Sequence, residues 1–480
     1  MRSKRVLALL LAALCVASPA VQAQTPANTA RAGPLALQDV LASARDHAPQ
    51  VLEALARVRG AQGALLSREG AFDTVFSADA ETRLTGFYGG TVAAASVSRP
   101  LPENGGYAYG GYRVSRGSFP SYEGEKFTNQ AGELKAGAVF ALMRDRAIDD
   151  RRFARSLAEA DVAIADADRL MIAIGVQRRA LDAYNAWVAA GLRLAIYKDL
   201  LALAEARQAG FKRQVAEGGR ARIILTENEQ NILRRQTLVV QTEQQLGQAA
   251  AALSLFWRDA AGNPVIPVLA QLPGTLPPLV RAAALAGAAD PRDVIASRPD
   301  LRTIDIRLRQ ASQRLELDRN ALLPKLDLKV EASRDFGAIG AGGISRSGTE
   351  SKVGLTFSVP FEQRAARGRL AQTNAEIDAV KQRRRFLEDQ IVAEIEALSV
   401  AVFATGRLRS IAADEQDRAA TMAGAERRRF EAGASDFFLV NLREEAAADA
   451  KVRALDAAIR NIAANAELAA VTADLDALGL

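Results

Sequence analysis

The chain has very few of the residues from which reactive sites are usually built. Its 480 residues include one cysteine, Cys15, and one histidine, His47. A zinc cluster needs several cysteine or histidine ligands, and a Cys/His nucleophilic pair needs both types, so the composition argues against both kinds of site. A disulfide needs two cysteines and is excluded as well. The sequence therefore predicts no catalytic residues, no metal site and no cofactor.

Long hydrophobic runs are missing beyond the N-terminal region. No segment after residue 23 approaches the roughly 20 apolar residues of a membrane-spanning helix. The N-terminal region differs, because Arg2, Lys4 and Arg5 precede an apolar stretch over 6–17 and small residues lead up to Ala23. This pattern is typical of a secretory signal peptide, and we expect cleavage after Ala23.

An excess of charge of one sign is also missing. Three of the 62 basic residues lie in the signal segment, which leaves 59 basic residues against 56 acidic ones. This small excess is spread along the chain, which argues against binding to nucleic acid.

What the chain does have is an organisation that occurs twice. DVLAS at 39–43 is answered by DVIAS at 293–297, and EGGRARIIL at 217–225 is answered by AGASDFFLV at 432–440. Such long-range self-similarity predicts a tandem duplication of one structural unit. The predicted organisation is a signal peptide at 1–23, a first repeat at 24–256, a proline-rich connector at 257–290 and a second repeat at 291–480.

Each repeat is expected to contain a helix, a pair of strands, a long helix and a shorter helix. Apolar residues at steps of three and four predict the helices, and apolar residues at every second position predict the strands. The predicted helices span 35–70, 146–214, 221–256, 291–321, 363–431 and 435–478, and the predicted strands span 73–83, 133–142, 325–333 and 352–360.

The alternation is clearest in KLDLKVEAS at 325–333, where one face is apolar and the other is mostly charged. Segments of this kind are typical of outer-membrane barrel strands, and the alternative is a half-buried strand of a soluble sheet. An open sheet in lipid must close, and four strands per chain are too few to enclose a lumen. The chain is therefore expected to pool its strands with copies of itself, and the striped long helices to pack laterally.

The first strand pair is interrupted by a glycine-rich insertion at 87–132. We expect an exposed loop on the extracellular side, with strand extensions as a variant. Its tyrosines are interpreted as an interfacial girdle or as loop packing, with ligand binding as the alternative. The insertion holds five of the seven tyrosines, Tyr88, Tyr107, Tyr109, Tyr112 and Tyr122.

Several segments, taken in order, resemble the TolC family of outer-membrane efflux ducts. They are SRPDL at 297–301, ALLPKLDL at 321–328, FSVPFEQRAARGRLAQTNAEI at 357–377 and RRFEAGAS at 428–435. The resemblance implies a homotrimer with a twelve-stranded barrel in the outer membrane of a Gram-negative bacterium and an α-helical periplasmic tunnel. Such ducts bind no cofactor. They work with a periplasmic adaptor and with an inner-membrane pump or ABC exporter of a type I secretion system.

By resemblance, the turns between the long and shorter helices form the tunnel tip where the adaptor docks. The alternative is that their glycines only cap helices. The residues that match this docking site are Glu217, Gly218 and Gly219 in the first repeat and Ala432, Gly433 and Ala434 in the second.

The chain departs from the family where carboxylates commonly ring the closed entrance. Leu439, Val440, Asn441 and Leu442 stand there in the second repeat, and Ile224 in the first, so the resemblance does not extend to an acidic ring. Our hypothesis is that Arg220 and Arg222 pair with Asp436 between neighbouring hairpins and hold the entrance closed. Independent, solvated charges are the alternative.

The sequence thus favours a passive exit duct for small molecules, metal ions or polypeptides. The competing hypothesis is a periplasmic coiled-coil scaffold or adaptor without a pore, which would leave the alternating strands unexplained. The identity of the cargo cannot be read from these residues.

Overall fold

The structure is a computed structural model that describes residues 33–278, 295, 298–340, 346 and 348–480. The predicted signal peptide at 1–23, with its cleavage after Ala23, lies outside the described residues. So does the DVIAS segment at 293–297, apart from Ile295.

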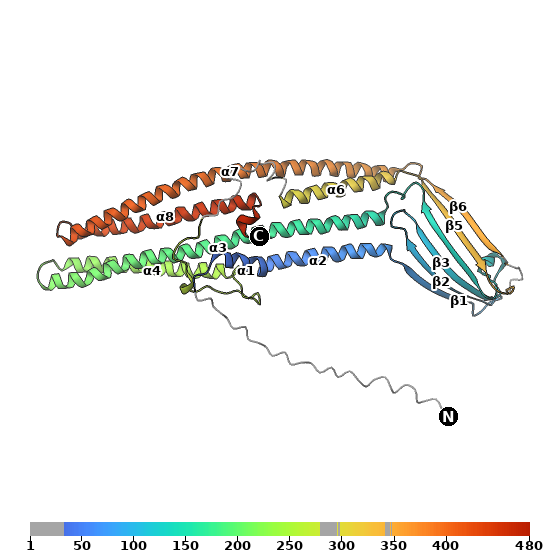
Figure 1. The fold of residues 1–480 in the computed structure, drawn as a ribbon, viewed down its shortest axis with the longest axis horizontal. Helices are drawn as coiled ribbons and strands as arrows, with labels where there is room; N and C mark the ends of the chain where they lie inside the picture. Colours follow the sequence, from blue (N-terminus) through green and yellow to red (C-terminus); the bar gives the residue numbers. More distant parts are fainter. Residues whose placement is uncertain (1–32, 279–294, 296–297, 341–345, 347) are drawn as a thin grey trace, which may run out of the picture.

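The molecule is elongated, with one antiparallel sheet at one end and long helices running away from it (Figure 1). Helices α1 and α2 precede the sheet strands of the first half, and α6 precedes those of the second. The helices are α1 (Leu37–His47), α2 (Pro49–Glu69), α3 (Asp150–Ala216), α4 (Ile223–Leu253), α6 (Pro299–Asn320), α7 (Arg364–Glu431), α8 (Phe437–Val471) and α9 (Leu475–Leu478). The strands are β1 (Val75–Thr82), β2 (Gly90–Pro100), β3 (Tyr107–Gly117), β4 (Glu133–Ala141), β5 (Lys325–Asp335) and β6 (Thr349–Ser358).

Helices α3 and α7 set the length of the molecule. They have 67 and 68 residues and contain no proline, so at 1.5 Å per residue each spans about 100 Å. Asp149 starts α3 by accepting a hydrogen bond from the backbone N–H of Arg152 at 2.8 Å, which satisfies one of the free donors of the first turn. α3 with α4, and α7 with α8, form two hairpins whose tips lie at the end opposite the sheet (Figure 1).

The first helical segment differs from the single helix expected at 35–70. The structure has two helices, because the chain leaves the helical conformation at Ala48, where ψ is 127°, and resumes it with Pro49 at the start of α2. A proline disfavours the helical conformation in the residue before it and lacks the N–H that would continue the helix.

The sheet differs more from the prediction. The expected loop at 87–132 contributes two full strands, β2 and β3. The described residues therefore form six strands in the order β1-β2-β3-β4-β5-β6, and the prediction of four was wrong. β1 and β4 do not pair with each other, because β2 and β3 lie between them. Three of the five tyrosines of the insertion are consequently strand residues of β3, whereas Tyr88 and Tyr122 lie in connections.

The main core lies along the helices, away from the sheet. Trp187 and Tyr184 of α3 pack against Val40 of α1 and Leu253 of α4, and each of these side chains is almost completely buried. The Tyr184 hydroxyl donates a hydrogen bond to the carbonyl of Leu35 at 2.7 Å. This core fixes α1 and α4 on α3.

Candidate functional site

The two helical hairpin tips have the same backbone geometry. Glu217 ends α3 and Gly218 follows in the left-handed conformation with φ 76°, while Ala432 ends α7 and Gly433 follows with φ 74°. The N–H groups of Gly219 and Ala434 then bond back to carbonyls of the last helical turn, at 2.8 Å in both cases. Because glycine adopts positive φ without steric cost, both glycines act as helix caps.

Two of the three charged residues predicted to close the entrance, Asp436 and Arg220, have other partners within this chain. Asp436 caps α8, since its side chain accepts a hydrogen bond from the N–H of Leu439 at 2.7 Å. The guanidinium of Arg220 lies over the rings of Phe430 and Phe211, at 5.2 and 5.7 Å from their centroids. Arg222 is the exposed residue before α4. In the described part of the chain, no ion pair joins either arginine to Asp436, and pairing between copies stays a prediction.

An aromatic cluster joins the two hairpins just behind the tips. Phe211 of α3 packs edge-on against Phe437 of α8 at 5.2 Å and near Phe430 of α7 at 6.4 Å. Ile224 of α4 completes this cluster and is 9% exposed. The tips of the two hairpins are therefore packed together within one chain.

A buried carboxylate tied to arginines lies further from the tips. Glu444 of α8 accepts a hydrogen bond from Arg207 of α3 at 2.6 Å, and it lies 3.5 Å from Arg235 of α4 and 3.4 Å from Arg427 of α7. The side chains of Glu444 and Arg235 are each 1% exposed. One carboxylate thus contacts a cation from each of the other three long helices.

Arg235 is held from several sides. It donates hydrogen bonds to the carbonyl of Leu200 and to the side chain of Asn441, both at 2.6 Å. Burial lowers the pKa of the Arg235 guanidinium from its ordinary value, and the charge of Glu444 opposes that shift. Sequence reasoning did not find this cluster, because arginine and glutamate in an alternating-charge helix usually belong to a solvated face.

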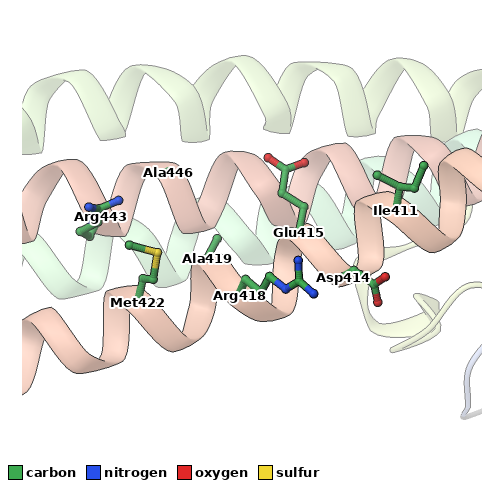
Figure 2. Close-up of a pocket in the computed structure, with 8 residues that line it drawn as sticks. All are labelled: Ile411, Asp414, Glu415, Arg418, Ala419, Met422, Arg443 and Ala446. Carbon is green, nitrogen blue, oxygen red and sulfur yellow. The ribbon is translucent and has the colours of Figure 1, made fainter.

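A shallow groove of about 490 Å³ lies between α7 and α8 on the tip side of the helices. Figure 2 shows Glu415 and Arg418 of α7 and Arg443 of α8 along it, with Ile411 and Met422 as apolar lining. Ile411 and Met422 are 60% and 47% exposed. The groove thus offers charges of both signs beside uncovered apolar side chains.

The sheet has two chemically distinct faces. The register of its five pairings puts alternate residues of all six strands on one face, which we call the apolar face, and the others on a polar face. The polar face carries the ion pairs Arg113–Glu133 at 2.6 Å and Lys329–Glu331 at 3.1 Å. The apolar face carries Phe76, Val97, Val114, Leu134, Phe140, Leu328, Val330, Val353, Leu355 and Phe357.

Much of the apolar face is uncovered. Phe76 is 72% exposed, Val353 73% and Leu355 67%. An exposed apolar patch of this kind marks a surface that contacts lipid or another protein.

None of the described helices is long and apolar enough to cross a membrane. Among the described residues there is also no group of histidine, cysteine, aspartate and glutamate side chains that could hold a metal ion.

The fold is that of known outer-membrane channels. The chain is similar to a membrane protein from Pseudomonas aeruginosa (TM-score 0.63, 16% identity, 91% of this chain and 93% of that one). It is also similar to the outer membrane protein VceC from Vibrio cholerae (0.61, 15%, 92% and 96%). A third is the MtrE outer membrane channel of Neisseria gonorrhoeae (0.61, 16%, 91% and 88%).

No curated protein sequence matches the chain. Residues 291–474 match the family described as outer membrane efflux protein. The match covers β5, β6, α7 and α8, so it includes the second hairpin and its tip. The resemblance expected from the sequence is confirmed: the chain has the fold of outer-membrane channels, and its residues 291–474 match the outer membrane efflux protein family.

Proposed function

We propose that three copies of this chain form a passive exit duct across the outer membrane of a Gram-negative bacterium. The observation that carries the proposal is the sheet with one apolar and one polar face, which lies at one end of the long helices (Figure 1). Its apolar face suits lipid, and its polar face suits a water-filled lumen. The helices would continue the passage into the periplasm.

The uncovered side chains of α7 support assembly of copies. Val400, Ile411 and Met422 recur every eleven residues, which is close to three helical turns, and are 69%, 60% and 47% exposed. They form one stripe that the other helices of this chain leave uncovered. Lateral packing of α7 against a neighbouring copy would bury it.

The hairpin tips are the proposed docking site for a periplasmic adaptor, at Glu217, Gly218 and Gly219 and at Ala432, Gly433 and Ala434. The residues of both glycine turns are exposed. An inner-membrane pump or an ABC exporter would complete the system. Capping and docking are compatible, because the caps use backbone groups and leave the outer surface of the turns free.

The test is reconstitution of the purified full-length protein in planar lipid bilayers, with electrophoresis of the unheated sample. The duct predicts a trimer in the outer-membrane fraction and discrete current steps. A soluble monomer without conductance would support the scaffold hypothesis instead. Adaptor docking is tested separately, by disulfide capture of a co-expressed adaptor with cysteine at Ala434, and with cysteine at the exposed Glu69 near the sheet as the control.

A further inference from the structure

The two outer strands of the sheet carry unused edges. β1 and β6 end the strand order, and every residue of both strands is exposed. An unpaired edge in lipid leaves backbone N–H and C=O groups without partners, at a cost of several kcal/mol for each group. Because the sheet formed by the described residues has six antiparallel strands, an even number, β1 of one copy runs antiparallel to β6 of another. The two edges are therefore complementary.

The β2–β3 hairpin is a full part of this sheet. β2 pairs with β3 at eleven successive positions, from Gly90 opposite Gly117 to Pro100 opposite Tyr107. β2 also pairs with the whole of β1, and β3 with seven residues of β4. Its alternation is in phase with its neighbours, since Val97 and Val114 lie on the apolar face and Ser96 and Arg113 on the polar face. The hairpin therefore has the surface of a membrane strand pair.

Side chains bind the hairpin to the rest of the sheet. Tyr109 crosses Gly137 of β4 and donates a hydrogen bond to Glu331 of β5. A Cβ atom at Gly137 would lie 2.7 Å from the Tyr109 ring, so this crossing requires glycine there. At the other end of β3, the N–H of Ser115 bonds to the buried Thr128 hydroxyl at 2.9 Å.

The turn between β2 and β3 rests at the helical end of the sheet. The carbonyl of Gly105 accepts a hydrogen bond from the N–H of Ala141 at 3.1 Å, and Arg152 of α3 bonds to the carbonyl of Glu103 at 3.2 Å. A Cβ atom at Gly105 would overlap the carbonyl oxygen of Asp145. The hairpin thus spans the sheet from end to end and adds no helix.

We propose that β1 of each copy pairs with β6 of the next, so that the trimer closes a barrel with six strands from each of three copies, eighteen in all. This inference rests on the trimeric duct proposed above and replaces the twelve strands implied by the family resemblance. Barrel diameter grows roughly in proportion to strand number, so the lumen would be about half again as wide. The added hairpin widens the outer-membrane part while leaving the number of tunnel helices unchanged.

The first experiment locates the edges by disulfide formation in outer membranes. Cys15 lies in the predicted signal peptide, so introduced thiols have no competitor in the mature chain. Ser77→Cys is combined in turn with Gly354→Cys, Thr356→Cys and Ser358→Cys, which cover neighbouring registers on the polar face. One combination is expected to give covalently linked trimers on a non-reducing gel. A protein that conducts current but shows no linkage in any combination would overturn the proposal.

Two controls report on the hairpin itself. The hydroxyls of Ser77 and Ser96 are 2.8 Å apart, so Ser77→Cys with Ser96→Cys is expected to form a disulfide within one chain. In a twelve-stranded barrel β1 would pair directly with β4, and Ser77→Cys would instead link to Lys135→Cys, the β4 residue level with it across the sheet. Here two strands intervene, which separates those positions by about 14 Å, beyond the reach of a disulfide. A linkage between 77 and 135 would refute the eighteen-strand barrel.

The second experiment measures width by polymer exclusion from the outer mouth in planar bilayers. Deleting 90–117 leaves four strands per copy and is expected to reduce the cross-section about twofold. A deletion protein that conducts with an unchanged polymer cut-off would overturn the proposal. If the deletion protein does not assemble, the disulfide experiment decides alone. Absence of any conductance from the wild type would refute the duct itself, which is a separate outcome.

Discussion

Tyr109 and Glu331 connect the two halves of the chain across the sheet. The hydroxyl of Tyr109 on β3 donates a hydrogen bond to the carboxylate of Glu331 on β5, and the phenol ring passes over Gly137 on the strand between them. Glu331 also pairs with Lys329 at 3.1 Å. The contact fixes the register of three strands at once, and it joins the inserted hairpin to a strand of the family-matched segment.

Replacing Tyr109 with phenylalanine tests this connection. Tyr109→Phe keeps the ring over Gly137 and removes only the hydrogen bond to a carboxylate, so we expect a loss of about 1–2 kcal/mol in the free energy of unfolding. Tyr107→Phe is the matched control, because Tyr107 lies on the same face of β3 without a hydrogen bond to Glu331. Urea unfolding followed by tyrosine fluorescence measures both, and equal losses would contradict the assignment.

Glu444→Gln is expected to destabilise the packing of the four long helices. It leaves Arg235 buried without a compensating charge, at a cost of about 3–5 kcal/mol. Glu445→Gln is the control, because its partner Arg234 is 64% exposed, and such a pair contributes about 0–1 kcal/mol. Thermal melting followed by helical circular dichroism compares the two variants. A melting temperature of Glu444→Gln equal to that of Glu445→Gln would show that the cluster does not hold the helices together.

Substitution by alanine is expected to have opposite effects at Gly218, in the turn after α3, and at Gly210, inside α3. Gly218 has φ 76° with no atom near the added methyl group, so Gly218→Ala is expected to cost about 1 kcal/mol from backbone strain alone. Gly210 lies inside α3 with equally open space, and Gly210→Ala is expected to stabilise by about 0.5–1 kcal/mol. Chemical unfolding of both variants checks the signs.

Asp436 has two roles to separate, the cap of α8 and the predicted closing charge. Asp436→Asn retains a good N-cap and removes the charge, whereas Asp436→Ala removes both and loses about 1 kcal/mol of cap stability. If pairing with Arg220 or Arg222 of a neighbouring hairpin closes the entrance, both variants raise single-channel conductance. An unchanged conductance in Asp436→Asn would remove the charge-pairing hypothesis.

Because the phenol of Tyr184 is buried, we expect the main helical core to lose stability at alkaline pH. Burial raises the pKa of Tyr184 from 10.0 to about 12, so the folded state favours the neutral phenol. The contribution to stability is complete below pH 10 and is lost as the pH rises from 10 to about 12. Unfolding free energies measured across that range are expected to fall more steeply for the wild type than for Tyr184→Phe. Parallel curves would contradict the raised pKa.

Much of the fold could be predicted because its signals are local. β5 carries a clean alternation in KLDLKVEAS, and α7 has a proline-free helical pattern that ends at Gly433. Pro49 indicates the break between α1 and α2, but the prediction of a single helix over 35–70 did not use it. The sequence of β2 carries a weaker strand signal, because GTVAAASVSRP is rich in alanine and serine, which have a weak preference for strands.

The candidate site was only partly predictable, because only some of its features are encoded by neighbouring residues. The tip glycines could be found, because positive φ after a helix leaves a glycine in the sequence. The role of Glu444 could not be found from the sequence, because it depends on arginines 17 to 237 residues away along the chain (Arg427 and Arg207). No local sequence pattern connects Glu444 to these arginines. Arg220 was assigned to an ion pair on charge alone, whereas the structure places it on aromatic rings.

By itself, the sequence determined the strand and helix periods, the glycine turns at 218 and 433 and the family resemblance of the second half, since each is encoded by neighbouring residues. Only the tertiary structure decided that β2 and β3 enter the sheet between β1 and β4. Strand formation there depends on backbone hydrogen bonds to partners on both sides and on Tyr109 meeting Gly137 and Glu331. Those contacts exist only once the chain has folded, because their partners are far apart in sequence.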